Sequence, residues 1–226
     1  MSLAFKHIFR LLTFRISREE ILQFNNKHFL IGLIATWLVG IGRWWDDPNA
    51  SLLQHLGLGS VIYIFLLALF IYILVWPFQA PNWNYKTLLI FISLTSFPAA
   101  LYAIPVERLM SMSTAASINA WFLGLVAIYR VSLLLFFLKR FTKLNTGRVV
   151  LLVLMPIFLI IFILTILNLE RAVFEIMGGI RNATANDSAY VILNILTFFS
   201  VFIAPVITLI YISEVVKIQL KKKKNN

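Results

Sequence analysis

The sequence predicts an all-α integral membrane protein: six transmembrane helices as three hairpins, an interfacial amphipathic N-terminal helix before them, and both termini in the cytoplasm. Three observations support this fold class. Of the 226 residues, 61% are hydrophobic and only 13% are charged. The apolar residues gather in blocks of roughly 17–25, about the length that crosses a hydrocarbon core. The cations lie between alternate blocks, as expected when cytoplasmic loops are enriched in Lys and Arg.

The Lys and Arg residues distinguish the two sides of the membrane. Fifteen of the 20 lie in the N-terminal arm, near Lys86, in segment 139–148 or in the tail. The loops between these segments hold Arg43, Arg108, Arg171 and Arg181. The first group is therefore predicted to be cytoplasmic. The net charge of +11 then reflects cations that flank apolar spans, so the expected partners are the lipid bilayer and anionic lipids at the inner face, not nucleic acid.

Residues 1–27 are predicted to form an amphipathic segment on the cytoplasmic face. Its apolar side chains are Leu3, Phe5, Ile8, Phe9, Leu11, Leu12 and Phe14. A second short helix is predicted over 17–23, because Ser17 precedes Glu19 and Glu20, and such residues favour a helix N-terminus. No small-residue cleavage site precedes the first apolar block, which is therefore expected to act as an uncleaved signal anchor.

A transmembrane domain is predicted over 28–216, followed by a basic cytoplasmic tail over 217–226. Its spans are predicted at about 29–45, 56–77, 86–104, 118–138, 149–168 and 189–213. Most Trp and Tyr residues fall near the ends of these spans, where amphipathic rings favour the membrane–water interface.

Small residues and prolines within the spans predict how the helices pack. Two stripes recur every four residues and allow close helix contact: Gly32, Thr36 and Gly40 in the first span, and Ala116, Ala120 and Gly124 in the fourth. Pro98, Pro156 and Pro205 each remove a backbone hydrogen bond. They predict kinks, with gating hinges as the alternative.

The acidic residues gather on the side opposite the cations. Carboxylates and arginines meet at three predicted outer tips, and we call these residues the outer patch. The outer patch comprises Arg43, Asp46, Asp47, His55, Glu107, Arg108, Glu170, Arg171 and Glu175. Two interpretations remain open. Either the charges neutralise one another at the interface, or they form a vestibule that binds a head group, a small solute or a cation.

Metal binding and acid–base chemistry are weakly indicated at the outer patch. Asp46 and Asp47 with a glutamate from another tip offer oxygen ligands for Mg²⁺ or Ca²⁺, but no metal-ligand spacing recurs, so neither a metal nor a cofactor is predicted. His55 is expected to be an interfacial residue. Cysteine is absent, which excludes disulfides and thiolate chemistry.

Arg130 is the charge that lies well inside a predicted span. Insertion of such a charge costs roughly 2.5–3.5 kcal/mol, and an intramembrane charge marks a candidate functional site. One interpretation is that its side chain reaches the inner phosphates. The other is that it faces the bundle and contacts a polar neighbour, Asn194 or Glu214, or an anionic substrate.

Two short motifs bear on localisation. Asn182 and Asn186 begin N-glycosylation acceptor patterns, and the C-terminal lysines match a dilysine retrieval pattern. Both matter only in a eukaryote, and the lysines also serve as a cytoplasmic anchor. The predicted location is a bacterial cytoplasmic membrane, with the endoplasmic reticulum as the alternative.

Three functions agree with these features. The leading hypothesis is a component of a transport, export or envelope assembly, acting with copies of itself or with another membrane protein. The second is a small solute or lipid transporter that uses Arg130. The third is an intramembrane enzyme that acts on lipid or envelope precursors through the outer carboxylates. Because no catalytic signature is present, an enzyme is the less favoured class.

Overall fold

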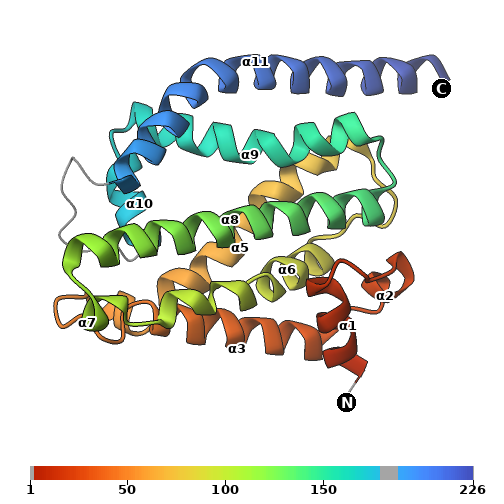
Figure 1. Ribbon diagram of the computed structural model, residues 1–226. Helices are drawn as coiled ribbons and strands as arrows, with labels where there is room; N and C mark the ends of the chain where they lie inside the picture. The colour runs from red at the N-terminus through yellow and green to blue at the C-terminus, as the bar shows by residue number, and fades with distance from the viewer. Residues whose placement is uncertain (1–2, 179–187, 226) are drawn as a thin grey trace.

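The computed structural model describes residues 3–178 and 188–225, and this part of the chain is all-helical, with 82% helix and no strand. Figure 1 shows the helices packed as an elongated bundle. The glycosylation patterns at Asn182 and Asn186, together with Arg181, lie outside the described residues. The side chain of Glu175 is also outside the described part.

The N-terminal arm contains two short helices. α1 spans Leu3–Leu12 and α2 spans Arg18–Leu22. Ser17 caps α2, because its hydroxyl accepts from the Glu20 amide while the Glu20 carboxylate accepts from the Ser17 amide. The predicted second helix is thus confirmed, and its first turn is acidic, as the helix dipole favours.

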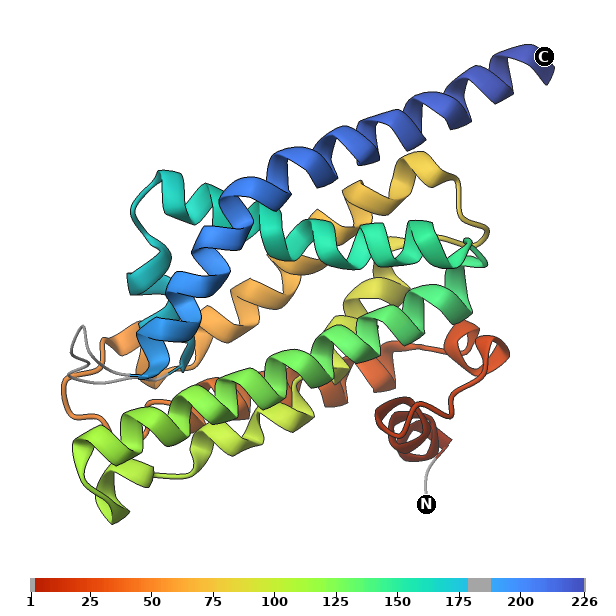
Figure 2. The same ribbon diagram turned by 45° about the horizontal axis from the view of Figure 1, so that its top comes forward.

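The long helices follow the apolar blocks. They are α3 (Asn26–Gly42), α5 (Leu58–Val75), α6 (Tyr85–Leu94), α8 (Met112–Thr142), α9 (Thr146–Ile166) and α11 (Ser188–Asn225). Short helices lie between them: α4 (Leu52–His55), α7 (Val106–Leu109), α10 (Glu170–Gly178) and the 3₁₀ helices η1 (Trp76–Phe78) and η2 (Phe97–Ala103). In Figures 1 and 2, α3, α6 and α9 run toward the end that carries α7 and α10, and α5, α8 and α11 run back.

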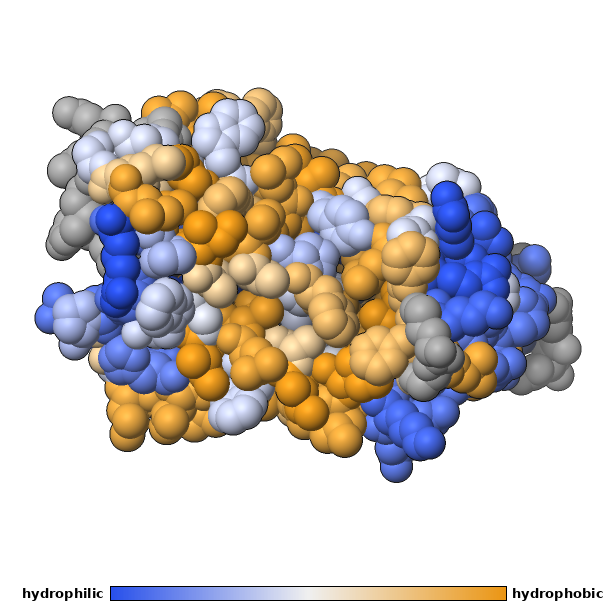
Figure 3. Space-filling model, turned by 60° about the horizontal axis from the view of Figure 1, so that its bottom comes forward, coloured by the Kyte–Doolittle hydropathy of each residue, from blue (hydrophilic) through white to orange (hydrophobic). Residues whose placement is uncertain are grey.

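Within the described residues, five segments are long and apolar enough to cross a membrane. They are Leu58–Phe78, Tyr85–Leu109, Thr114–Thr142, Thr146–Ile166 and Val191–Lys223. α3, which coincides with the predicted first span, is shorter at 17 residues. Figure 3 shows a broad hydrophobic belt between two hydrophilic ends of the molecule. These features are compatible with a multipass membrane protein.

Prolines interrupt the helices in two ways. Pro98 follows the end of α6 and lies in the first turn of η2, so the third apolar block is an α-helix that continues as a 3₁₀ helix. Pro156 and Pro205 lie inside α9 and α11, and α11 is visibly bent in Figures 1 and 2.

Two contacts join α3, α6 and α8 into one core. Gly32 of α3 lies so close to α6 that an added Cβ would be 2.2 Å from the Ser93 Oγ. The rings of Phe91 and Phe137 stack with centroids 4.0 Å apart, and both side chains are fully buried. The predicted small-residue stripe of α3 therefore packs the bundle, because Gly32, Thr36 and Gly40 are all buried.

The arm is attached to the bundle at the end opposite α7 and α10. The His7 and His28 rings stack with centroids 5.3 Å apart, and each residue is 2% exposed. The Tyr129 hydroxyl of α8 donates to the Leu12 carbonyl at the end of α1. α1 therefore packs against protein on its buried face, while Phe5 and Phe9 remain exposed.

Candidate functional site

A partly open cavity of about 740 Å³ lies between the helices of the bundle. Side chains from α3, α5, α6, η2, α8, α9, α10 and α11 line it. Its volume is in the range of small-molecule sites, which are about 300–1,000 Å³. Most of the lining is aliphatic or aromatic, and the titratable residues among the described lining are Arg43, Tyr63, Tyr102, Arg130 and Glu170.

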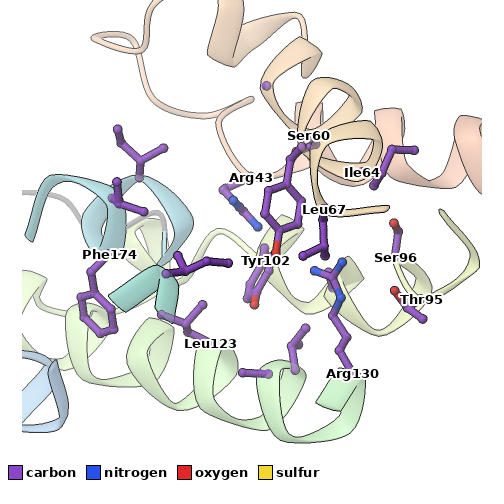
Figure 4. Close-up of a pocket in the computed structure, with 18 of the residues that line it drawn as sticks. Arg43, Ser60, Ile64, Leu67, Thr95, Ser96, Tyr102, Leu123, Arg130 and Phe174 are labelled. Carbon is purple, nitrogen blue, oxygen red and sulfur yellow. The ribbon is translucent and has the colours of Figure 1, made fainter. Parts of the chain in front are cut away.

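Arg130 extends from the middle of α8 into this cavity (Figure 4). Its guanidinium carbon lies 5.7 Å from the centroid of the Tyr63 ring, which α5 contributes. Within the described part of the chain, Arg130 forms no ion pair, since Glu214 pairs instead with Arg148 at 3.0 Å and with Lys217 at 2.9 Å. Arg130 therefore faces the bundle interior.

Arg43 is the second cation of the cavity. It is the residue that caps the C-terminus of α3, and its guanidinium carbon lies 4.4 Å from the centroid of the Tyr102 ring. Its Nε is buried and has no hydrogen-bond partner among the described residues. A guanidinium over an aromatic face is stabilised by the ring quadrupole, but its N–H groups remain available to an acceptor.

Hydroxyl groups line the wall between α3 and α6. The Thr36 and Ser96 hydroxyl oxygens lie 2.6 Å apart, and Thr36 also donates within α3 to the Gly32 carbonyl. Thr95 donates to the Ile92 carbonyl at 2.7 Å. These hydroxyls are therefore satisfied within the protein, and the arginines carry the polar character of the cavity.

Glu170, at the start of α10, is the acidic residue of the outer patch that lines the cavity. Its Oε2 atom is buried without a hydrogen-bond partner among the described residues. With two arginines and one glutamate, the described lining of the cavity carries a net positive charge, which favours an anionic ligand.

Other members of the outer patch contact one another outside the cavity. Arg108, in the second predicted tip, lies with its Nε 3.6 Å from Oδ2 of Asp46 in the first tip. The Arg108 guanidinium carbon also lies 4.8 Å from the Trp45 ring centroid, and the Trp45 indole donates to the Ala103 carbonyl. The first two tips are therefore in direct contact through these side chains.

The remaining carboxylates of the outer patch have local partners. Asp47 is buried and accepts from the Asn49 amide at 3.0 Å. Glu107 accepts from the Asn119 side chain of α8 at 2.6 Å. His55 ends α4 and is half-buried, while Arg171 is exposed on α10. Across the described residues, no three His, Asp or Glu side chains come close enough to hold a metal ion.

Tyr63 and Tyr102 belong to the site, although neither was assigned a functional role from the sequence. Tyr102, near the end of the third predicted span, is 9% exposed, and the Arg43 guanidinium lies over its ring. Tyr63 lies seven residues after the start of the second predicted span. Because a tyrosine hydroxyl inside an apolar span needs a polar partner, this position could have indicated a contact in the bundle interior. The pairing of each arginine with a tyrosine depends on contacts between different helices.

Neither a protein-family model, nor a curated protein, nor a solved structure matches this chain. The site described above therefore supplies the evidence on function.

Proposed function

We propose that this chain is a six-span transporter of the bacterial cytoplasmic membrane that moves an anionic solute or lipid, with Arg130 binding the anionic group. The observation that supports this proposal is the location of Arg130 in a cavity within the apolar part of the bundle, without a carboxylate partner among the described residues. A charge in that position is costly, and a ligand anion offsets the cost.

The proposed topology takes α3 as the first span. Its 17 residues extend about 25 Å at ~1.5 Å per residue, and its sequence is apolar over most of that length. α3 with α5, α6 with α8, and α9 with α11 then form three hairpins with both termini in the cytoplasm. The basic segment 139–148 and the basic end of α11 agree with that orientation.

The same geometry favours the transporter hypothesis over the enzyme hypothesis. Of the carboxylates proposed for acid–base work, only Glu170 lines the cavity within the described residues, while Asp46 and Glu107 have contacts elsewhere. Two of the helices that line the cavity can bend at a proline: α9 at Pro156 and α11 at Pro205.

The proposal is tested with purified protein in liposomes. Arg130→Ala should reduce transport of a fluorescent anionic lipid or of a labelled organic anion by roughly 10- to 100-fold, because hydrogen bonds to a charged group contribute about 1.5–3 kcal/mol. Arg140→Ala is the matched control, since Arg140 is an exposed arginine near the end of the same helix. Equal transport by the wild type and Arg130→Ala, at equal insertion, would refute the role of Arg130.

A further inference from the structure

We infer that the ligand of this cavity is an amphiphile: a hydrocarbon chain that carries an oxyanion head group, a phosphate or a carboxylate, held between Arg43 and Arg130. This inference rests on the proposed function for the claim that the cavity is a binding site, and it adds the chemical class of the ligand. It is carried by two observations, one on the polar part of the cavity and one on its apolar part.

The two guanidinium groups share one region of the cavity. Figure 4 shows Arg43 and Arg130 reaching toward Tyr102 from opposite sides, Arg43 from the end of α3 and Arg130 from α8. Neither forms an ion pair with a described carboxylate, and the Arg43 Nε is buried without a partner. Two cations in an apolar cavity repel each other, and Glu170, the carboxylate of the described lining, forms an ion pair with neither, so an anion between the two arginines would stabilise both.

The geometry of the side chains favours an oxyanion over a halide or a neutral group. Guanidinium is a planar fork of N–H donors that matches the oxygens of phosphate and carboxylate. The guanidinium carbons of both arginines lie over tyrosine rings, 4.4 Å from the centroid of Tyr102 for Arg43 and 5.7 Å from that of Tyr63 for Arg130. A cation–π contact uses no N–H donor, so these donors can still bind the oxygens of a ligand.

The rest of the cavity is unsuited to a small hydrated anion. Apart from the arginines, Glu170 and a few hydroxyl groups, most of its lining is aliphatic or aromatic, as at Ile64, Leu67, Leu123 and Phe174 (Figure 4). Water that filled this part would be in contact with apolar surface on nearly every side, which is unfavourable. A hydrocarbon chain attached to the oxyanion occupies it favourably, at about 25 cal/mol per Å² of apolar area removed from water.

A binding experiment on the full-length protein in phosphatidylcholine nanodiscs tests the inference. The probe is radiolabelled dodecyl phosphate, with empty nanodiscs as background. Unlabelled dodecyl phosphate should displace it. Dodecanol, which has the chain alone, and inorganic phosphate, which has the head group alone, should compete at least 10-fold less well. Arg43→Ala and Arg130→Ala should each weaken binding by roughly 10-fold or more, and Arg140→Ala should leave it unchanged.

A cavity-filling variant guards against loss of binding through misfolding. A Cβ added at Gly124 meets nothing within 4 Å, and Gly124 lines the cavity. Gly124→Leu should therefore preserve thermal stability while reducing the binding of dodecyl phosphate. Unchanged binding in Gly124→Leu and in both arginine variants would overturn the inference.

The outcomes separate this inference from the proposed function. If inorganic phosphate competes as well as dodecyl phosphate, the amphiphile is refuted, while transport of a small anion through Arg130 still stands. If dodecanol competes equally well, the arginine clamp is refuted. Arginine-dependent binding of dodecyl phosphate, with no transport of any anion in liposomes, supports the inference and refutes the transporter.

Discussion

Arg108 and Asp46 connect two tips of the bundle that are far apart in the sequence, with the Arg108 Nε 3.6 Å from the Asp46 Oδ2. The contact is reinforced by Trp45, whose ring lies 4.8 Å from the Arg108 guanidinium carbon. The Arg108 side chain is 57% exposed, whereas the Asp46 side chain is 3% exposed. The ion pair with Asp46 and the cation–π contact with Trp45 therefore together hold the Arg108 side chain at the surface of the protein.

Arg108→Ala should lower stability only modestly. Because the Arg108 side chain is largely exposed, solvent screens its ion pair with Asp46, which contributes about 0–1 kcal/mol, and its cation–π contact with Trp45 contributes about 0.5–1 kcal/mol. The expected result is a decrease of a few degrees in the Tm in detergent, smaller at high salt because salt screens the ion pair. Arg108→Lys keeps the charge but not the planar stack, so it should recover only part of the loss. A salt-independent loss would contradict the ion-pair contribution.

The His7–His28 contact should make attachment of α1 depend on pH. The His7 Nδ1 and the His28 Nε2 lie 3.2 Å apart, so a proton on both atoms would place two N–H donors against each other. The contact therefore favours a state with at most one charged ring, and it should weaken as the pH falls below the ordinary histidine range near about 6.5. The Asn25 amide donates to the His28 Nδ1, which a proton on that atom would prevent.

Amide hydrogen exchange of α1 measures this effect. Protection, corrected for intrinsic rates, should be lower at pH 5.5 than at pH 7.5. His28→Gln, which does not titrate, should abolish the difference, and His55→Gln, at the opposite end of the bundle, should retain it. Greater protection of α1 at pH 5.5 in the wild type would contradict the predicted sign.

Gly57 should tolerate no side chain. Its φ is +66°, in the left-handed region, which costs other residues about 1–2 kcal/mol. An added Cβ would also lie 2.7 Å from the Ile41 backbone nitrogen and 2.8 Å from the Trp37 carbonyl oxygen. Gly57→Ala should therefore lower the Tm clearly. Gly59→Ala, where the Cβ meets open space within a helix, should be neutral or stabilising by about 0.5–1 kcal/mol.

Gly32→Ala should separate α3 from α6. The new Cβ would lie 2.9 Å from the Ser93 Cβ and 3.0 Å from the Ser93 backbone carbon, so the helices must shift, at a cost of about 1–3 kcal/mol. Ser93→Gly in the same chain should restore part of the lost stability. Gly124→Ala, in open space, is the control. Additive effects of Gly32→Ala and Ser93→Gly would show that the two residues do not share this contact.

The helices were predictable because each apolar block carries its own local signals. The second predicted span, 56–77, corresponds to α5 over Leu58–Val75, and the fifth, 149–168, to α9 over Thr146–Ile166. Ser17 and its acidic neighbours defined the start of α2. In the third block, composition did not reveal that helix α6 ends at Leu94 and that a 3₁₀ helix, with Pro98 in its first turn, begins at Phe97.

The candidate site was only partly predictable, because its contacts join helices that are distant in sequence. Arg130 could be selected from its position inside an apolar block alone. The proximity of Arg43 to Tyr102, and of Arg130 to Tyr63, depends on how each helix is rotated about its own axis. A helix that is apolar on all sides offers no pattern from which that rotation can be predicted. For the same reason, the contact of Asp46 with Arg108, a residue of another tip, was not evident from spacing.

The hydrogen bond from Tyr129 to the Leu12 carbonyl connects the N-terminal arm to the residue directly before Arg130. An anion that draws Arg130 toward Arg43 would act on the same turn of α8 that holds the end of α1. If ligand binding in the cavity changes the free energy of arm attachment, then detachment of the arm must change the free energy of ligand binding by the same amount. Binding in the cavity and attachment of the arm would then be thermodynamically coupled through this turn of α8.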